Sequence, residues 1–381
     1  MKTKVFQENL RRLIDFSERN NIHKIMILND SNQTWLGASR LRGSLLIIDI
    51  SERDIRYYTP LLEYYRSYDI IKSNIDQSFN LKIYAYYRYK LQEVPEDINV
   101  LDKDLNKIIS EEIKVSSEKE LRCGYDDINM IFSDELRDVL KKYCIDIRNE
   151  VLDIRSVKTS YEIEIISKAA EISIKALRKL LDEELIGYSE KQIAAKLLYM
   201  IRFYGADEEA FPLIVASASN SVYPHSKPED RIIRYGDMIL IDIGARINEY
   251  NSDMTRMIVH KGSGAYEGYI EAVNEAVNNS LEKISAGIKG SFIDNIARET
   301  LRRRGLAKYF IHSLGHGVGI DVHEKPSLSP DSQDILRENM IFTIEPGIYI
   351  KDLVGIRIEE LVLLDKRGPK VLTDMERIIF Y

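Results

Sequence analysis

The sequence predicts two domains, a smaller α/β domain followed by a larger α+β domain. At 381 residues the chain is long enough for two or three domains, each with its own core. Short apolar runs alternate with helical patterns in the first part, whereas the second part combines long helical segments with β-hairpins. The predicted boundaries are 1–145 and 150–381, with the junction in the stretch around 149–164.

Apolar spacing defines the elements of the first domain. Leu10, Leu13 and Ile14 recur at helical intervals, which predicts a helix over 5–19. Short apolar runs without that spacing are typical of buried strands. Such runs occur at 24–28, 44–49 and 81–87, and a helical stretch near 131–143 precedes a further run at 144–148.

The second domain begins with a helical pattern. Ser160 is a candidate N-cap for a helix that contains Ile165, Ile166 and Ala170. Further helices are predicted over 190–204, 266–284 and 291–304, with strands between them.

The composition is that of an ordinary soluble globular protein, with 44% hydrophobic and 30% charged residues. A net charge of −7 argues against nucleic acid as the main partner, since phosphate binding needs a basic surface. The segment MKTKVFQENLRR does not resemble a secretory signal, and no run of about 18 apolar residues predicts a membrane span. Cys123 and Cys144 lie in unrelated segments and are expected to be reduced thiols. These observations favour a cytoplasmic enzyme.

Four acids in the second domain lie within apolar, strand-like runs. They are Asp242 in MILIDIGA, Asp253 in NSDMTRMIV, Glu345 in MIFTIEPGIYI and Glu359 in GIRIEELVLL. A buried carboxylate without a partner costs several kcal/mol or more, and Arg357 is the one obvious cation in these segments. Metal ions are the simplest way to neutralise the remaining charge.

The first two acids lie on a predicted hairpin. If its turn is centred between Ile247 and Asn248, Asp242 lies directly opposite Asp253. Opposed side chains have Cβ atoms about 4.5–5.5 Å apart, and like charges at that position destabilise a sheet. A shift of one residue would turn either side chain to the other face.

The other two acids repeat this arrangement on a hairpin centred near Asp352, which places Glu345 opposite Glu359. A single acid of this kind is most simply a carboxylate at a strand edge in solvent. Four of them on two hairpins, with a histidine between the pairs, favour a metal site instead.

Three of the six histidines, His312, His316 and His323, fall within the segment HSLGHGVGIDVHEK. The glycines around His316 argue against a helix and favour a loop or strand that approaches a ligand closely. This excludes the helical His-Glu-x-x-His arrangement of many zinc proteases. His225 lies apart from the others, in SVYPHSKP.

Together, the motifs IDIGA, NSDMTR, HSLGHGVGIDVHE, IEPGIY and RIEE resemble those of the creatinase/aminopeptidase P/prolidase group of metallopeptidases. The resemblance spans Val151 to Tyr381 and implies the pita-bread catalytic fold. The upstream part, 1–145, is similar to the smaller N-terminal domain common in that group.

The resemblance implies two divalent metal ions. Asp242 is implied as a ligand of the first ion, and His316 and Glu345 as ligands of the second, with Asp253 and Glu359 bridging both. Carboxylates with one imidazole suit Mn²⁺, Fe²⁺ or Co²⁺. Mn²⁺ is the expected ion, with Co²⁺, Fe²⁺ and Zn²⁺ as alternatives.

Catalytic roles also follow from the resemblance. Glu345 is expected to carry the proton from the attacking water towards the leaving amine. His323 and His225 are expected to stabilise the substrate carbonyl and the tetrahedral intermediate. His312 is expected to shape the pocket or to help bind the residue on the far side of the scissile bond. Arg357 orients a ligand carboxylate or contacts substrate, with a plain salt bridge as the alternative, and His225 has an ordinary surface histidine as its alternative.

The implied substrates are peptides with proline after the scissile bond. The favoured function is that of an Xaa-Pro aminopeptidase, which releases the N-terminal residue, and the alternative is an Xaa-Pro dipeptidase (prolidase). Ser327 occupies a position at which several dipeptidases of the group carry arginine, which weakens the dipeptidase assignment. Lys325 or Arg357 could replace that arginine.

Three other interpretations are less favoured. A methionine aminopeptidase usually lacks an N-terminal domain of this kind. Creatinase-like hydrolases lack the metal ligands, and non-enzymatic peptide-binding modules on this fold tend to lose them. The group also implies a homodimer, in which Trp35 is a candidate wall for a proline ring in a neighbouring pocket, with a core aromatic residue as the alternative.

Overall fold

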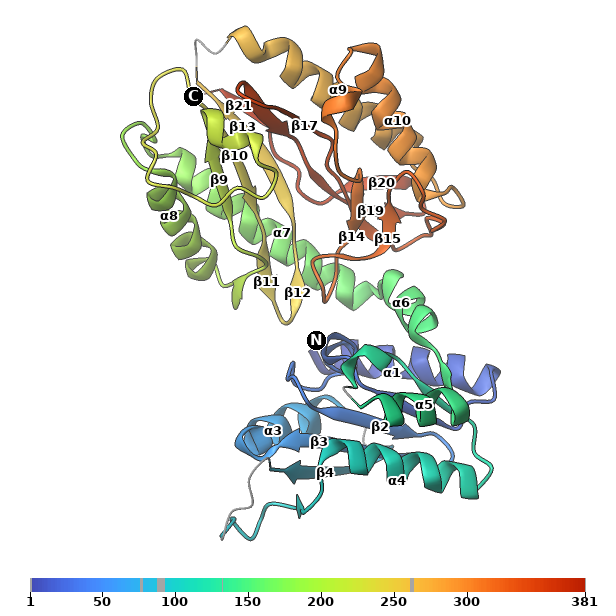
Figure 1. Cartoon of the computed structure of the whole chain (residues 1–381). Helices are drawn as coiled ribbons and strands as arrows, with labels where there is room; N and C mark the ends of the chain where they lie inside the picture. Colours follow the sequence, from blue (N-terminus) through green and yellow to red (C-terminus); the bar gives the residue numbers. More distant parts are fainter. Residues whose placement is uncertain (1, 76–77, 88–92, 132, 261–263, 381) are drawn as a thin grey trace. The chain divides into compact units, whose positions relative to one another are not determined.

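The computed structural model describes residues 2–75, 78–87, 93–131, 133–260 and 264–380 (Figure 1). It divides into two compact units, Met1–Arg155 and Ser156–Tyr381, which we call the N-terminal unit and the C-terminal unit. In the described part of the chain, no helix combines the length and the apolar character needed to cross a membrane.

The N-terminal unit is an α/β structure. Its helices are α1 (Lys2–Arg19), α2 (Asp30–Trp35), α3 (Tyr64–Asn74), α4 (Leu105–Glu118) and α5 (Asp134–Tyr143), with 3-10 turns η1 (Leu61–Glu63) and η2 (Ile128–Met130). Its strands are β1 (Lys24–Ile27), β2 (Leu45–Asp49), β3 (Asp54–Pro60), β4 (Asn80–Tyr86), β5 (Val100–Leu101), β6 (Cys123–Tyr125) and β7 (Cys144–Asp146). Helix α6 (Arg148–Ser156) runs across the division between the units.

Within the described residues, these strands form one mixed sheet in the order β5-β4-β3-β2-β1-β6-β7. Apolar side chains of α4 and α5, such as Ile109 and Leu140, belong to the same buried cluster as Met26 and Ile47 of the sheet. Burial of this apolar surface is the main force that holds helices to the sheet.

Two features of the N-terminal unit bear on the predictions. Cys123 and Cys144 form a disulfide, so the expectation of reduced thiols is wrong. The parallel strands β6 and β7 are neighbours, and their register places the two Cα atoms 4.8 Å apart. Trp35 is only 1% exposed, which confirms the alternative of a core residue and removes the support for a wall of a neighbouring pocket.

In its described residues, the C-terminal unit contains four long helices and several small sheets. The helices are α7 (Ser160–Leu181), α8 (Glu190–Phe203), α9 (Glu267–Lys283) and α10 (Gly290–Arg303), with 3-10 turns η3 (Ala218–Val222), η4 (Gly264–Tyr266) and η5 (Ala307–Tyr309). The strands are β8 (Glu208–Glu209), β9 (Ile214–Ser217), β10 (Met238–Ile243), β11 (Ala245–Ile247), β12 (Tyr250–Asn251), β13 (Met254–Val259), β14 (Gly315–Gly317), β15 (Glu324–Leu328), β16 (Ile341–Ile344), β17 (Gly347–Ile350), β18 (Val354–Arg357), β19 (Glu360–Asp365), β20 (Gly368–Val371) and β21 (Ile378–Phe380).

The helices cover the strands in two pairs. Figure 1 shows α7 and α8 along the sheet β21-β13-β10-β9, and α9 and α10 beside the strands β14 to β20. Leu177 and Ile193 share a buried cluster with Ile241 in the first half, and Val273 and Ile293 share another with strands of the second half. The predicted N-cap Ser160 is wrong by one residue, because Ser160 is the first residue of helix α7 and Thr159 is its N-cap.

The first predicted hairpin is present with a different register. Strands β10 and β13 pair Asp242 with Thr255, so Asp253 is a diagonal neighbour on the same face of the pair, and direct opposition is wrong. The turn is centred one residue later than predicted, because Asn248 and Glu249 both adopt positive φ in a two-residue turn. Such turns match the twist of the flanking strands, which favours this register.

The second hairpin has the predicted register. Strands β16 and β19 pair Ile344 with Glu360, and strands β17 and β18 pair Gly347 with Arg357. Both pairings have their centre at Asp352. Glu345 and Glu359 therefore lie between the two ladders, at the same level of the hairpin.

Candidate metal centre

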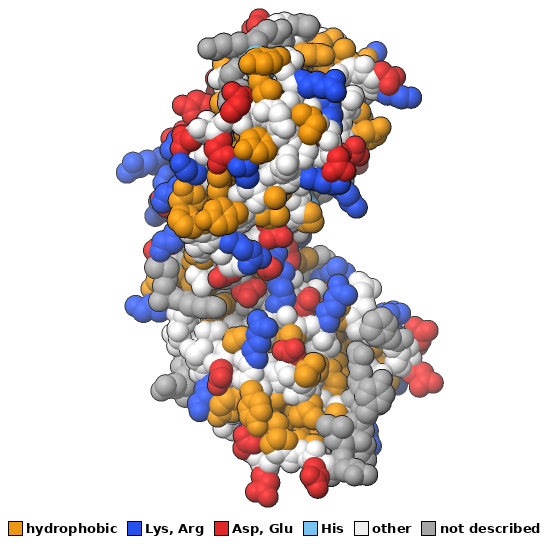
Figure 2. Space-filling model, turned by 90° about the vertical axis from the view of Figure 1, so that its left-hand side faces the viewer, with side chains coloured by type: hydrophobic (Ala, Val, Ile, Leu, Met, Phe, Trp, Pro, Cys, Tyr) orange, Lys and Arg blue, Asp and Glu red, His pale blue; other side chains and the backbone are white. Residues whose placement is uncertain are grey.

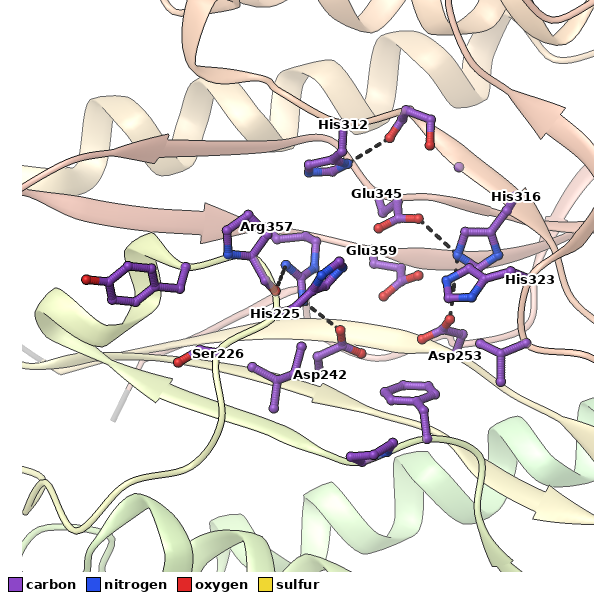
Figure 3. A pocket seen from close by; sticks show the side chains of 18 of the residues that line it. His225, Ser226, Asp242, Asp253, His312, His316, His323, Glu345, Arg357 and Glu359 are labelled. Carbon is purple, nitrogen blue, oxygen red and sulfur yellow. Dashed lines mark hydrogen bonds and ion pairs between the residues drawn. The ribbon is translucent and has the colours of Figure 1, made fainter.

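A pocket of about 1200 Å³ lies in the C-terminal unit (Figure 3). Segments far apart in the sequence meet in its walls. Every residue predicted for the site lines it: His225, Asp242, Asp253, His312, His316, His323, Glu345, Arg357 and Glu359. Apolar side chains, among them Phe211, Ile311 and Val322, form other parts of the wall.

The carboxylates of this pocket are buried and repel one another. Asp242, Asp253 and Glu359 are 8%, 4% and 1% exposed. Burial, and then the charge of neighbouring carboxylates, raises the pKa of both Asp253 and Glu359 well above the ordinary range. Burial also raises the pKa of Asp242, although Arg357 acts in the opposite direction. The ionised forms are therefore unfavourable unless positive charge is supplied.

Glu345 and His316 lie in close contact. The Oε1 atom of Glu345 is 3.1 Å from Nε2 of His316, and Oδ2 of Asp253 is 3.8 Å from the same nitrogen. Burial acts to raise the pKa of Glu345, but the hydrogen bond and charge of His316 outweigh it and lower the pKa to about 2. The bond to Glu345 likewise raises the pKa of His316 against the effect of burial.

Close backbone packing explains the glycines around His316. A Cβ atom on Gly315 would lie 2.0 Å from the carbonyl oxygen of Thr343, and one on Gly317 would lie 2.0 Å from that of Lys325. Only glycine allows β14 to pair with β15 and β16 at these positions. The segment is a strand, which confirms that His316 is not presented by a helix.

The donor atoms fit divalent cations. Within the described residues, Asp253, His316 and Glu359 each offer one ligand atom, and these atoms all lie within 4.8 Å of one another. The Oδ1 atom of Asp242 is buried and has no hydrogen-bond partner among the described residues, which is costly for a carboxylate oxygen. Carboxylate oxygens with one imidazole are suitable ligands for ions such as Mn²⁺. A cation among them would satisfy that oxygen and relieve the repulsion between the acids.

Arg357 uses all three of its nitrogens inside the pocket wall. Nη2 contacts Oδ2 of Asp242 at 2.6 Å, and Nε donates to the hydroxyl of Thr255 at 3.1 Å. Nη1 donates to the hydroxyl of Tyr349 at 2.8 Å and to the carbonyl oxygen of Pro224 at 3.1 Å. These contacts favour the orientation of a ligand carboxylate over direct contact with substrate.

Two threonines in the site were missed by sequence reasoning. Thr255 donates to Oε2 of Glu359 at 2.8 Å, and Thr343 donates to Oε1 of Glu345 at 3.2 Å. Each threonine lies two residues from an acid on the same strand-like run, so strand alternation places it on the same side. That alternation was the available signal, and it was not used.

The remaining histidines lie around the carboxylates. Figure 3 shows the rings of His225 and His323 turned toward the pocket, and the His323 and His316 rings are 4.2 Å apart between centroids. Nε2 of His312 is 3.2 Å from the hydroxyl of Tyr349. Burial lowers the pKa of His312, and burial followed by the charge of His316 lowers that of His323. Both rings are therefore neutral near pH 7.

The sequence has full-length relatives among curated proteins. It is 36% identical over 377 residues to a protein named Xaa-Pro dipeptidase from Pyrococcus furiosus, which covers 97% of this chain and 99% of the relative. It is 35% identical to a protein of the same name from Pyrococcus horikoshii, over 98% of this chain and 99% of the relative.

Solved structures with the same architecture include an X-Pro aminopeptidase from Thermotoga maritima, with a TM-score of 0.81 and 30% identity over 97% of this chain and 98% of that one. The prolidase from Pyrococcus furiosus has a TM-score of 0.76 and 34% identity, over 96% of this chain and all of that one. These similarities confirm the predicted pita-bread catalytic fold with a smaller N-terminal domain. Residues 164–366 match the Peptidase_M24 family, which confirms the predicted resemblance and the prediction of an enzyme. The chain belongs to metallopeptidase family M24.

Proposed function

We propose that the chain is an Xaa-Pro dipeptidase, which hydrolyses the peptide bond before proline in a dipeptide. Two relatives that are 36% and 35% identical over nearly their whole length carry that name. The sequence alone favoured an Xaa-Pro aminopeptidase and kept the dipeptidase as the alternative. The relatives support the alternative better, so the order of the two is reversed here.

The proposed cofactor is a pair of divalent ions, with Mn²⁺ first and Co²⁺, Fe²⁺ or Zn²⁺ as alternatives. Its proposed ligands are Asp242, Asp253, His316, Glu345 and Glu359. The observation that carries this proposal is the convergence of four carboxylates and one imidazole on one pocket, with Oδ1 of Asp242 left without a partner. When bound, such ions polarise the scissile carbonyl and make water a better nucleophile.

The side chains of this pocket have distinct proposed roles. Glu345 is ionised at neutral pH and can accept a proton from the attacking water and pass it to the proline nitrogen that leaves. His323 and His225 can donate to the carbonyl oxygen as negative charge develops on it. Arg357 holds Asp242 in place, and His312 forms part of the wall through its contact with Tyr349.

One assay compares the proposed function with its competitors. Mn²⁺-loaded protein is given an Xaa-Pro dipeptide, an Xaa-Pro-Yaa tripeptide and a Met-Ala peptide in parallel. We expect hydrolysis of the dipeptide with little release from the tripeptide. Release from the tripeptide alone would favour the aminopeptidase, and cleavage of the methionyl peptide alone would contradict both.

The Xaa-Pro aminopeptidase remains the second candidate because of one observation. The chain superposes on the X-Pro aminopeptidase from Thermotoga maritima with a TM-score of 0.81 over 97% of its length. One fold is therefore compatible with either activity.

A homodimer in the cytoplasm is proposed as the form in which the enzyme works. The dimer rests on the resemblance to the family alone. Sedimentation equilibrium of the full chain tests the dimer, and a monomer at micromolar concentration would contradict it.

A further inference from the structure

A lysine in the pocket wall has no partner among the described residues. Lys227 lines the pocket, is exposed, and lies two residues after His225 on the segment between η3 and β10. No described carboxylate lies within ion-pair distance of its ammonium group. Several acids line the same pocket, but Lys227 is not paired with any of them. Its ammonium group is therefore available to a ligand.

The other cations near the site are already engaged. Arg357 directs every side-chain nitrogen to a protein partner, as described above. Lys325 lies outside the pocket lining, and its ammonium is 3.8 Å from a carboxylate oxygen of Asp334. Ser327 lines the pocket but carries no charge. Of the two described basic side chains that line the pocket, Arg357 and Lys227, only Lys227 can therefore offer a free charge to a bound molecule.

The backbone on either side of Lys227 is held by hydrogen bonds to Glu190, which is fully buried at the start of α8. Its carboxylate accepts from the backbone N–H and the hydroxyl of Ser217 at 2.6 Å, from Nδ2 of Asn220 at 2.7 Å and from the N–H of Glu229 at 3.0 Å. These partners lie on both sides of Lys227 in the sequence. One carboxylate thus connects the two ends of the segment, while the lysine side chain makes no ion pair with the described residues.

We propose that Lys227 binds the C-terminal carboxylate of the dipeptide substrate. The inference rests on the proposed dipeptidase function, in which the proline to be released carries a free carboxylate close to the scissile bond. With the charge of the pocket's acids balanced by the proposed ions, a cation in the pocket wall attracts that carboxylate and fixes its position. The flexible ammonium of lysine offers three donors and suits a partner whose position varies with the residue before proline.

The test compares a charged substrate with a neutral one. Mn²⁺-loaded wild type, Lys227→Met and Lys227→Arg are assayed on an Xaa-Pro dipeptide and on the same dipeptide as its C-terminal amide. Lys366→Met, an exposed lysine outside the pocket, is the matched control. We expect Lys227→Met to raise KM for the dipeptide by about 10- to 100-fold, the loss typical of a hydrogen bond to a charged group, with a much smaller effect on the amide. Lys227→Arg should retain most of the preference for the free acid.

The outcomes distinguish an error about Lys227 from an error about the dipeptidase function. If wild type hydrolyses the dipeptide but Lys227→Met keeps the same KM and the same preference for acid over amide, the assignment of Lys227 is wrong. If wild type does not hydrolyse the dipeptide at all, the proposed function fails and the assignment fails with it. If Lys366→Met lost the preference for the free dipeptide over its amide as much as Lys227→Met does, the effect would be one of overall charge. That result would also overturn the assignment.

Discussion

Asp253 lies among three other carboxylates of the pocket, and burial together with their charges disfavours its ionised form although Arg357 acts in the opposite direction. Burial, the charge of Glu359 and the charge of Asp242 all act against its ionised form. The same closeness that disfavours the metal-free protein makes the site a strong ligand set. The instability of the metal-free site and its affinity for metal therefore have the same origin, which is the closeness of the carboxylates.

Asp253→Asn should change stability in opposite directions with and without metal. The metal-free variant should be more stable than wild type, on the order of 1 kcal/mol, because one repelling charge is removed. Mn²⁺ should stabilise wild type strongly and the variant little, because a ligand is missing. Thermal unfolding in EDTA and in Mn²⁺ measures both, with Asp374→Asn, an exposed acid outside the pocket, as control. Equal stabilisation of variant and wild type by Mn²⁺ would contradict the ligand assignment.

Asp126 of the N-terminal unit predicts a pH dependence of stability. Burial raises its pKa to about 7, although Asn32 and the backbone N–H groups of Leu28 and Asn29 donate to it. Because the pKa in the folded state exceeds the unfolded value of 3.8, this group stabilises most at low pH. Its contribution should fall as the pH rises from about 4 to about 7, by a few kcal/mol in order of magnitude.

Urea unfolding of wild type and Asp126→Asn at pH 5, 6, 7 and 8 measures this contribution. The unfolding free energy of wild type minus that of the variant should fall as the pH rises towards about 7, since asparagine does not titrate. The comparison within one pair of proteins removes the titration of the other acids. A difference that stays constant across the range would contradict the assignment.

Sequence context predicted some residues of the site and could not predict others. Asp242 and Glu359 stand out because carboxylates are rare within apolar runs. Lys227 and Glu190 do not stand out, because a lysine in a loop and a glutamate in the first turn of a helix are ordinary. Their significance depends on which distant segments they meet, and only the folded chain contains that information.

At the level of elements, the hairpins show what local patterns determine. The apolar runs located β10, β13, β16 and β19 well, and the second register was predicted correctly. The first register was wrong by one residue at its centre because the positive φ of Asn248 and Glu249 is a choice of turn type, which the apolar pattern does not specify. Strand β3 and helix α4 were missed, although Ile109, Ile113 and Ser116 of α4 recur at helical intervals.

The buried carboxylate of Glu190 accepts hydrogen bonds from both ends of the segment from Ser217 to Glu229. Glu190→Ala removes a carboxylate that accepts four hydrogen bonds from this segment. The variant should therefore loosen the segment, which carries His225 and Lys227. Unsatisfied buried donors cost about 1–3 kcal/mol each, so kcat/KM should fall by at least about 10-fold. Hydrogen exchange of the segment should rise in parallel.

Glu183→Gln is the matched control for Glu190, because Glu183 pairs with Lys196 at the surface, where an ion pair contributes about 0–1 kcal/mol. It should leave both exchange and kinetics close to wild type. Unchanged exchange in Glu190→Ala would show that other contacts hold the segment.

The disulfide of the N-terminal unit joins strands β6 and β7. Its two cysteines are 21 residues apart in the sequence, and closing a loop of that size stabilises a fold by about 3 kcal/mol in the chain-entropy model. Dithiothreitol should therefore lower the unfolding free energy of wild type by about that amount. It should have no effect on the variant with both Cys123→Ser and Cys144→Ser, and equal stability of oxidised and reduced wild type would contradict the expectation.

At the scale of the whole molecule, the order of motifs along the chain predicted the fold class. Five short motifs in a fixed order indicated the family, and the similarity to the Pyrococcus furiosus prolidase structure over 96% of the chain agrees with it. The choice between dipeptidase and aminopeptidase could not be made in the same way. That choice depends on a few atoms that meet the end of the substrate, and they are not part of the motifs that define the family.

The central claim is that five side chains of one pocket hold two divalent ions. A crystal of the full chain grown with Mn²⁺, measured at a wavelength where manganese scatters anomalously, tests it most directly. We expect two anomalous peaks in contact with the side chains of Asp242, Asp253, His316, Glu345 and Glu359. A map without anomalous density among these five side chains at saturating Mn²⁺ would contradict it.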